Sequence, residues 1–310
     1  MNTTISPPAG KRTLAAPSAP PAANDAEVRI REGRPADAEA GGRVFYQAFA
    51  AIASRHNFPI EMPSPEFAAW EVARMLDHPG FWCAVAERGG EIVGSAFADL
   101  RSAIVGIGPV AVAPAEQDHG VGRLLMEAAL ERVREAGAPG VRLVQTAYHY
   151  RSLALYAKLG FEVRETLSVL QGPPIGRAVA GRQTRLATPA DLGACDAVCR
   201  RVHGHDRSGE VGDAIGARTA MVVEHDGHIT GYATGFGYVD HAVGETDADL
   251  KALLGAAEGF IGLGFLLPSG NTALLGWCLE HGLKIVQQST LMTIGLYNEP
   301  AGAWLPSIRY

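Results

Sequence analysis

The sequence predicts an α/β protein whose unit, a mixed and twisted sheet with helices on both faces, occurs twice in tandem. Three observations predict this architecture. The chain has 310 residues, which is roughly twice the usual domain length. Segments from its first half recur in its second half in the same order. Stretches with the periodicity of strands and of helices alternate irregularly along each half.

The internal repeat consists of three pairs of short segments. The pairs are 34–37 with 188–191, 85–94 with 222–231, and 152–163 with 274–285. In the first pair each member carries Pro-Ala-Asp and opens a helix, and in the second each is a strand, a glycine turn and another strand. The spacing between the pairs shrinks along the chain, which indicates a duplication whose second copy is shorter.

The first two helices of the first copy are predicted from their apolar faces and their first turns. Residues 35–55 form the first helix, with Pro35 in its first turn. Its apolar face consists of Val44, Phe45, Ala48, Phe49 and Ile52. Ser64 caps a second helix that has Pro65 at its first position and runs to about residue 76. These helices are expected to cover one face of the sheet.

The remaining elements of the first copy alternate between strands and helices. The predicted strands are 28–31, 81–86, 91–99, a strand ending at Ala113, 141–145 and 162–170. One helix begins near Gly120 and closes near Gly137, and another contains Tyr156. This order predicts a central sheet in which strands of both directions occur.

The most informative stretch lies where a strand enters a glycine-marked helix. An apolar run from Val110 breaks at Pro114, crosses a polar turn and continues into a helix whose first turn contains Gly120 and Gly122. Backbone N–H groups at a helix start lack partners within the helix, and glycine lets an anion approach them closely. The stretch therefore predicts a phosphate-binding site. A P-loop and a G-x-G-x-x-G motif are both absent from it.

Two motifs resemble those of the GNAT N-acetyltransferase superfamily. Gln117-x-x-Gly120-x-Gly122, preceded by Val-Ala-Val-Ala-Pro, resembles its acyl-CoA-binding motif. Leu155-Tyr156-Ala-Lys-Leu-Gly-Phe is similar to its closing helix and turn. The resemblance implies a GNAT acyl-CoA N-acyltransferase fold in two tandem copies, with acetyl-CoA as co-substrate and no metal.

The resemblance also implies which residues bind acetyl-CoA. Backbone groups of the strand before the helix would hold the acyl carbonyl and the pantetheine arm, and the turn would hold the pyrophosphate. The residues concerned are Val110, Ala111, Val112, Gln117, Asp118, His119, Gly120, Val121, Gly122 and Arg123. Arg123 and Lys158 either meet phosphates or are solvated cations.

The catalytic residues are expected beside the second motif. Tyr156 is the expected general acid, because a tyrosine keeps its proton at neutral pH and can share it with the leaving sulfur. Many relatives place a glutamate on the strand before the phosphate site, but residues 103–109 contain no carboxylate. His149 is one candidate base, and the alternatives are ordered water or a residue from the first two helices. Family analogy places the acceptor pocket near three aromatic residues, Phe58, Trp70 and Phe81.

The second copy is expected to lack catalysis. Residues 250–265, taken as its counterpart of the phosphate site, contain glycines in a hydrophobic setting, and Cys278 stands where the tyrosine would be. Asn271 occupies the position where the family has asparagine. We expect residues 1–25 to be a disordered tail, 26–172 a catalytic GNAT domain, and 180–310 a degenerate GNAT-like domain that shapes the acceptor cleft.

Composition bounds the partners. The formal net charge of −6 argues against nucleic acid, and no apolar run reaches the ~18 residues of a membrane span. The four cysteines form no C-x-x-C pair, which fits reduced thiols and a cytoplasmic location. We expect a monomeric or homodimeric N-acetyltransferase that acts on a primary amine of a small molecule. Two alternatives remain: acetylation of a protein lysine or N-terminus, and a non-catalytic acyl-CoA-binding sensor or scaffold.

Overall fold

The computed structural model describes residues 27–310, so the expected tail lies outside the described residues. Every element predicted in the first copy is present, with small shifts at its ends. The elements are β1 (Arg29–Glu32), η1 (Pro35–Asp37), α1 (Ala38–Arg55), α2 (Pro65–Asp77), β2 (Phe81–Arg88), β3 (Glu91–Asp99), β4 (Ile104–Val112), η2 (Pro114–Glu116), α3 (Val121–Glu135), β5 (Gly140–Thr146), α4 (Tyr150–Lys158) and β6 (Glu162–Gln171). Ser64 caps α2 as predicted, accepting a hydrogen bond from the Phe67 backbone N–H at 3.2 Å.

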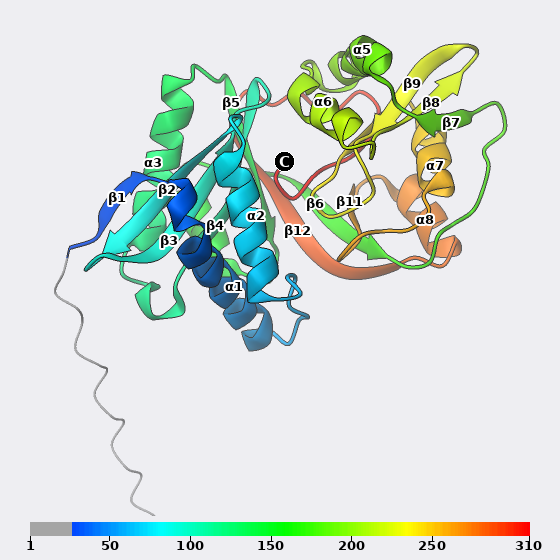
Figure 1. Cartoon of the computed structure of the whole chain (residues 1–310). Coiled ribbons are helices and arrows are strands. Elements are labelled where there is room, and N and C mark those ends of the chain that lie inside the picture. Colours follow the sequence, from blue (N-terminus) through cyan, green and yellow to red (C-terminus); the bar gives the residue numbers. More distant parts are fainter. Residues whose placement is uncertain (1–26) are drawn as a thin grey trace, which may run out of the picture.

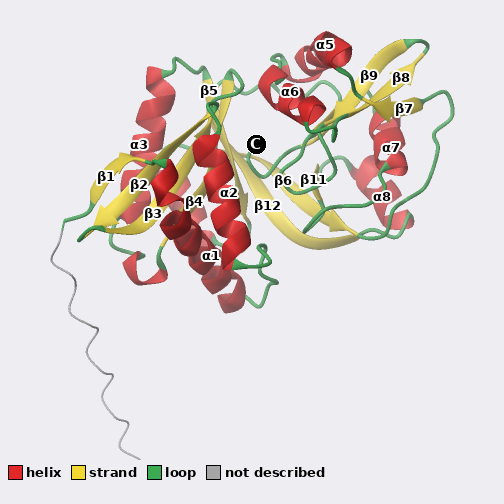
Figure 2. Cartoon of the chain, in the orientation of Figure 1, coloured by secondary structure: helices red, strands yellow, loops and turns green. Residues whose placement is uncertain are grey.

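Helices cover both faces of the first copy's sheet (Figure 2). Successive side chains of a strand point to opposite faces. Ala84 and Ala86 of β2 accordingly pack with Leu125 of α3, while Cys83 and Val85 pack with the apolar side of α2. The mixed sheet with helices on both faces is therefore confirmed.

The second copy repeats this order of elements. It consists of β7 (Gln183–Leu186), η3 (Pro189–Asp191), α5 (Leu192–His203), α6 (Ser208–Gly216), β8 (Met221–His225), β9 (His228–Ala233), β10 (Ala242–Gly244), α7 (Asp247–Ala256), β11 (Phe265–Pro268), α8 (Thr272–Glu280), β12 (Lys284–Gly295) and β13 (Ala303–Leu305). Val222 of β8 faces α5, and the adjacent Val223 packs in the core that α7 and α8 cover. None of the helices in residues 27–310 is long and apolar enough to cross a membrane.

The duplicated Pro-Ala-Asp segments form the same ion-paired corner in both copies. In the first copy, the guanidinium of Arg31 lies 2.7 Å from carboxylate oxygens of both Asp37 and Glu87. The equivalent residues of the second copy are Arg185, Asp191 and Glu224. Asp37 and Asp191 also accept hydrogen bonds from the backbone N–H three residues earlier. The repeat seen in the sequence thus corresponds to a repeated structure.

The two copies exchange strands within one sheet, which the sequence did not predict. An eight-stranded sheet has the order β1-β2-β3-β4-β5-β12-β6-β11, so β12 of the second copy lies between β5 and β6 of the first. In return, β6 lies between β12 and β11 of the second copy. Figure 1 shows β12 and β6 side by side where the two groups of helices meet. A separate five-stranded sheet, β13-β10-β9-β8-β7, completes the second copy.

Candidate functional site

The N-terminus of α3 is open and exposed. Gly120 precedes the helix with φ 83°, a left-handed conformation that glycine adopts without strain, and no side chain caps the helix. None of the backbone N–H groups from Gln117 to Gly122 donates a hydrogen bond to any residue that the structure describes. The first turn also contains no acidic residue. These groups are therefore available to an anion.

Side chains around this turn fix its shape. The Gln117 amide donates to the Val112 carbonyl at 3.0 Å, which ties the turn to the end of β4. Arg151 of α4 lies 2.9 Å from Asp118 and donates to the Gln117 side-chain oxygen at 3.3 Å. The sequence analysis did not identify Arg151. Its position adds a cation beside the open N–H groups.

The other predicted residues of the turn differ in their exposure. His119 is exposed, and Val121 is buried against the sheet. The Arg123 guanidinium lies 3.7 Å from Glu127 on the same exposed helix surface. Gly122 has space for a Cβ, whose nearest neighbours would be Leu155 at 3.5 Å and Val112 at 3.7 Å.

Strand β4 separates from β5 beside this turn. The two parallel strands pair only from Ile104 to Gly106, and a bulge in β4 follows between Ile107 and Val110. The Ala113 N–H donates to the Val93 carbonyl of β3. Along a strand the backbone N–H and C=O groups of successive residues point to opposite sides, so those of Val110 and Val112 point away from β3. By the same alternation, the backbone groups of Ala111 face β3. Of the three predicted strand residues, two therefore offer backbone groups to the gap.

A cavity of about 990 Å³ extends from the open turn through this gap. Its lining includes Gly120, Gly122, Val110, Val112, Tyr156 and His149. Side chains of α1 and α2 form another wall, and Phe45, Phe49 and Ile52 of the predicted apolar face line the cavity, although Phe45 and Phe49 also pack against the core. The second copy closes it with Thr219, Gly235 and residues 237–240, 261–263 and 308–309.

Tyr156 lies on α4 and lines this cavity. Burial raises the pKa of its hydroxyl to about 12, because the ionised form is poorly solvated there. The tyrosine therefore keeps its proton throughout the neutral range. Its ring also packs against Phe161, with a centroid separation of 6.0 Å.

His149 precedes α4 and lines the same cavity. Burial, reinforced by the charge of Arg151, lowers the pKa of its imidazole to about 4. The imidazole is thus neutral at pH 7 but a weak base. The His149 carbonyl accepts hydrogen bonds from Gln145 at 2.9 Å and Ser152 at 2.8 Å, which fixes the start of the helix.

The sequence analysis named Asp118 but missed the other three carboxylates of the cavity. Glu61, Glu71 and Asp240 line it, from the α1–α2 loop, from α2 and from the second copy. No sequence motif marks them, since they are far apart in the chain. The lining does not include Phe58, Trp70 or Phe81, which were expected there. Phe58 stacks on Tyr148, Trp70 is exposed, and Phe81 packs beneath Arg101 and Arg309.

The place that corresponds to the open turn in the second copy is filled. Helix α7, the counterpart of α3, begins after Thr246, so residues 250–265 were wrongly taken as the counterpart and instead include the end of α7 and the loop to β11. Thr246 and Asp249 form a capping box, with the Thr246 N–H donating to the Asp249 carboxylate at 2.9 Å. Cys278, in the tyrosine position, is buried in an apolar core, and Asn271 caps α8 by accepting from Leu274 at 3.0 Å.

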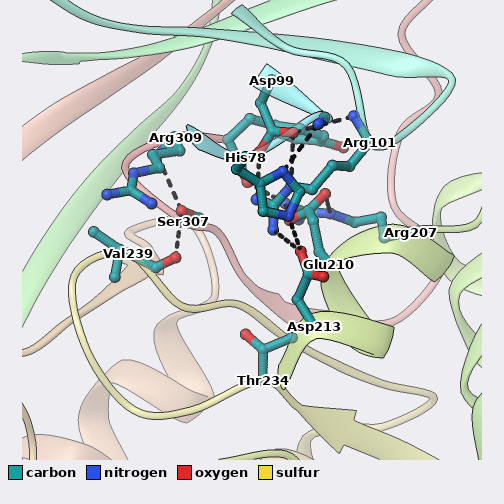
Figure 3. Close-up of polar contacts among 12 residues, drawn as sticks. His78, Asp99, Arg101, Arg207, Glu210, Asp213, Thr234, Val239, Ser307 and Arg309 are labelled. Carbon is teal, nitrogen blue, oxygen red and sulfur yellow. Dashed lines mark hydrogen bonds and ion pairs between the residues drawn. The ribbon is translucent and has the colours of Figure 1, made fainter. Parts of the chain in front are cut away.

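Ion pairs hold the second copy against the cavity-bearing copy. Figure 3 shows Arg101 between Asp99 of β3 and Asp213 of α6, and the guanidinium lies 2.6 Å from Asp213. His78 lies 3.2 Å from the same Asp213 carboxylate. Nearby, Arg309 pairs with Glu71 of α2. These contacts fix residues of the second copy where they wall the cavity.

The splayed mixed sheet, the open start of α3 and the strand exchange define a tandem acyltransferase fold of the GNAT type. Residues 46–161 match the acetyltransferase (GNAT) family. By this match the first copy is a GNAT-type acetyltransferase domain, of a family whose members use acetyl-CoA. No curated protein matches the chain.

Solved structures resemble the chain over most of its length. A putative acetyltransferase from Pyrococcus horikoshii is 20% identical, with a TM-score of 0.66 over 89% of this chain and 94% of its own. A GCN5-related N-acetyltransferase from Sphaerobacter thermophilus is 17% identical, with a TM-score of 0.58 over 88% and 96%. A tandem GNAT protein from the clavulanic acid biosynthesis pathway is 14% identical, with a TM-score of 0.53 over 87% and 98%. This likeness shows the fold.

Proposed function

We propose that the protein transfers an acetyl group from acetyl-CoA directly to the primary amine of a small molecule. One observation carries the proposal: a single cavity runs from the open N-terminus of α3, past the free edge of β4 and Tyr156, to a wall made by the second copy. A donor entering at the turn and an acceptor held at the wall would meet in that cavity.

The donor would bind through backbone groups. The N–H groups from Gln117 to Gly122 would hold the pyrophosphate, and Arg151, Arg123 and Lys158 would add positive charge beside it. Backbone groups of the free β4 edge would pair with the pantetheine arm and polarise the thioester carbonyl. Side-chain identity matters little for these contacts, which explains why the strand itself is plainly apolar.

Tyr156 would act as general acid. Its raised pKa keeps the hydroxyl protonated, so a proton is available while the C–S bond breaks and charge develops on sulfur. The nitrogen that has just bonded to the acyl carbon is acidic and would return a proton to the tyrosinate. His149 is a poorer candidate for the base, because its lowered pKa weakens it.

The second copy would have no transferase site of its own, with residues 26–172 as the catalytic domain and 180–310 as the degenerate one. Its capping box ties up the Thr246 N–H and places two carboxylates in the first turn, and Cys278 lies within the core. The same copy walls the acceptor end through Tyr238, Ile261 and Arg309. This enclosure favours a small acceptor over a protein lysine or a protein N-terminus.

The test measures release of the CoA thiol from acetyl-CoA with a panel of small amines, a lysine-containing peptide and a peptide with a free N-terminus. We expect turnover with small amines and at most trace turnover with peptides. Acetyl-CoA at ~100 times its Kd should also stabilise the protein by ~2.7 kcal/mol in thermal unfolding. Binding of acetyl-CoA without turnover of any amine would contradict the proposal. Faster turnover of the peptides than of the small amines would instead indicate a protein acetyltransferase.

A further inference from the structure

The acceptor end of the cavity is mainly apolar. Its walls come from α1, from α2 and from the loop residues of the second copy. The apolar side chains that line it include Phe45, Phe49, Ile52, Met62, Phe67 and Ile261. A ligand that fills this space must therefore have an apolar body, because each hydrated polar group would be stripped of water without a partner.

The three carboxylates in this lining differ in how their charge is balanced. Glu71 pairs with Arg309 and lies 3.3 Å from Arg74. Asp240 accepts from the Gly237 backbone N–H at 2.8 Å; burial raises its pKa, and the Gly237 hydrogen bond and the positive charge of Arg309 partly offset that effect. Glu61 has no cationic partner in the part of the chain that the structure describes. Among these carboxylates it alone lacks a nearby guanidinium.

Glu61 is held by residues of the second copy. The Gln287 amide of β12 donates to the Glu61 carboxylate at 3.2 Å and lies 3.2 Å from the Tyr238 hydroxyl. Gln287 is only 4% exposed, because the strand exchange places β12 between β5 and β6. The carboxylate from the first copy and the amide from the second therefore form one site.

This site presents a carboxylate whose charge no cation of residues 27–310 balances. The Glu61 carboxylate and the Tyr238 hydroxyl line the cavity, while Gln287 lies behind them, outside the lining. Buried carboxylates are normally paired, so Glu61, which lines the cavity with no cation beside it among residues 27–310, points to a ligand that brings charged N–H donors. An ammonium group offers three donors and the charge that balances Glu61.

We propose that Glu61 binds the ammonium group of the acceptor and takes its proton, that Gln287 and Tyr238 of the second copy position the Glu61 carboxylate, and that the acceptor is a primary amine on an apolar body. This inference rests on the proposed acetyl transfer. It assigns the second copy a part in catalysis although that copy has no transferase site of its own.

Every proton in the proposed reaction has a donor and an acceptor. An R–NH3⁺ acceptor gives one proton to the Glu61 carboxylate, and the resulting amine attacks the thioester carbon. The N–C bond forms, the C–S bond breaks, and Tyr156 protonates the leaving thiolate. The new amide nitrogen gives its second proton to the tyrosinate, and Glu61 releases the first to solvent. The products are the N-acetyl amine, CoA thiol and one proton.

The first experiment compares phenethylamine with spermidine as acceptors for the wild type and for Glu61→Gln. We expect phenethylamine to be the better acceptor, and Glu61→Gln to lower its kcat/KM about 100-fold or more while the Kd for acetyl-CoA is unchanged. Glu91→Gln is the matched control, because Glu91 is exposed at the β2–β3 turn, away from the cavity lining. It should retain wild-type kinetics.

The second experiment tests positioning through the pH profile of kcat/KM. The Gln287 hydrogen bond favours ionised Glu61, so Gln287→Met should raise the pKa of Glu61 and move the acidic limb to higher pH. Tyr148 and Tyr238 face Glu61 and stay neutral in this range, whereas His149 and Asp240 titrate in the same cavity. If the acidic limb of the kcat/KM profile reports Glu61, it must be absent from the residual activity of Glu61→Gln. It must still be present in His149→Gln.

The outcomes separate this inference from the proposed function. If the wild type acetylates amines but Glu61→Gln retains its kcat/KM, Glu61 is not the base and the acetyltransferase proposal stands. Preference for spermidine overturns the apolar acceptor. Tyr238→Phe removes only a hydroxyl. If the acidic limb of the kcat/KM profile stays at its wild-type pH in both Gln287→Met and Tyr238→Phe, positioning by the second copy is overturned. Absence of turnover with every amine overturns both proposals.

Discussion

The N-termini of α3 and α7 are at equivalent positions in the two copies, but the first is uncapped and the second is capped by acidic side chains. Gly120 precedes α3 without a side-chain cap and without acidic residues in the first turn. Thr246 and Asp249 cap α7, and Asp247 adds a second acidic residue there. Because a helix start carries partial positive charge, the first end is open to anions, whereas at the second the Thr246 N–H is already bound and two carboxylates repel an anion. A helix start binds a phosphate only where the chain leaves it uncapped.

The helices that follow differ in the same way. Tyr156 of α4 lies against the cavity, whereas Cys278 of α8 lies in an apolar core where burial raises its pKa to about 12. Asn271 accepts from Leu274 and donates to Asp247 at 2.7 Å, so it joins α8 to α7. Residues of the second copy at these positions stabilise the fold instead of facing a substrate.

Tyr156→Phe should have the largest effect. Loss of the hydroxyl removes the proposed general acid, so kcat should fall about 100- to 1000-fold while the Kd for acetyl-CoA stays unchanged. The rate of CoA thiol release at saturating substrates measures kcat, and calorimetric titration measures the Kd for acetyl-CoA. Cys278→Ala, at the matching position, should lower thermal stability but retain kcat. Equal losses of kcat in both variants would contradict the contrast drawn between α4 and α8.

Gly120→Asp should have the next largest effect, because it gives α3 the acidic cap of α7. The carboxylate would accept from the open N–H groups and repel the pyrophosphate, at a cost of about 2 kcal/mol, or roughly 30-fold in the Kd for acetyl-CoA. Asp tolerates the left-handed conformation of Gly120 better than most residues. Calorimetric titration measures the change.

Two matched variants sharpen this second test. Gly120→Asn retains the cap without the charge and should weaken binding less than Gly120→Asp. Thr246→Ala removes the cap of α7 and should cost about 1 kcal/mol of stability without altering acetyl-CoA affinity. An unchanged Kd in Gly120→Asp would show that the pyrophosphate does not use the α3 N-terminus.

Local signals in the sequence predicted the elements of the first copy well. Ser64 followed by proline marked the start of α2, and Gly120 marked the start of α3. The Pro-Ala-Asp repeat predicted the duplication, and the two copies do share an ion-paired corner. Caps, turns and periodicity act over a few residues, so a single sequence reveals them.

Contacts between distant segments could not be predicted in this way. Nothing local indicates that β12 inserts between β5 and β6, since pairing depends on the whole sheet. Glu61 likewise lies in a loop with no motif, and only its contact with Gln287 marks it. Residues 250–265 were wrongly taken as the counterpart of the phosphate site because of their glycines, whereas Thr246 and Asp249 form a capping signal that the sequence already contained.

The smallest expected effect concerns the corner that both copies retain. Asp37→Asn and Asp191→Asn should each cost about 1–2 kcal/mol at pH 7, because each leaves an arginine with a weaker partner. Hydrogen bonds from Arg31 and Arg185 lower the pKa of these carboxyls, so their stabilisation is complete above the unfolded pKa of ~3.9 and is lost as pH falls through the folded value. Denaturant unfolding of the variants against wild type should show a gap that narrows below about pH 4. Similar losses of unfolding free energy in the two variants would mean that both copies kept this corner as a stabilising feature while the site diverged. A loss confined to Asp37→Asn would mean that the second copy is stabilised by the strand exchange and not by its own corner.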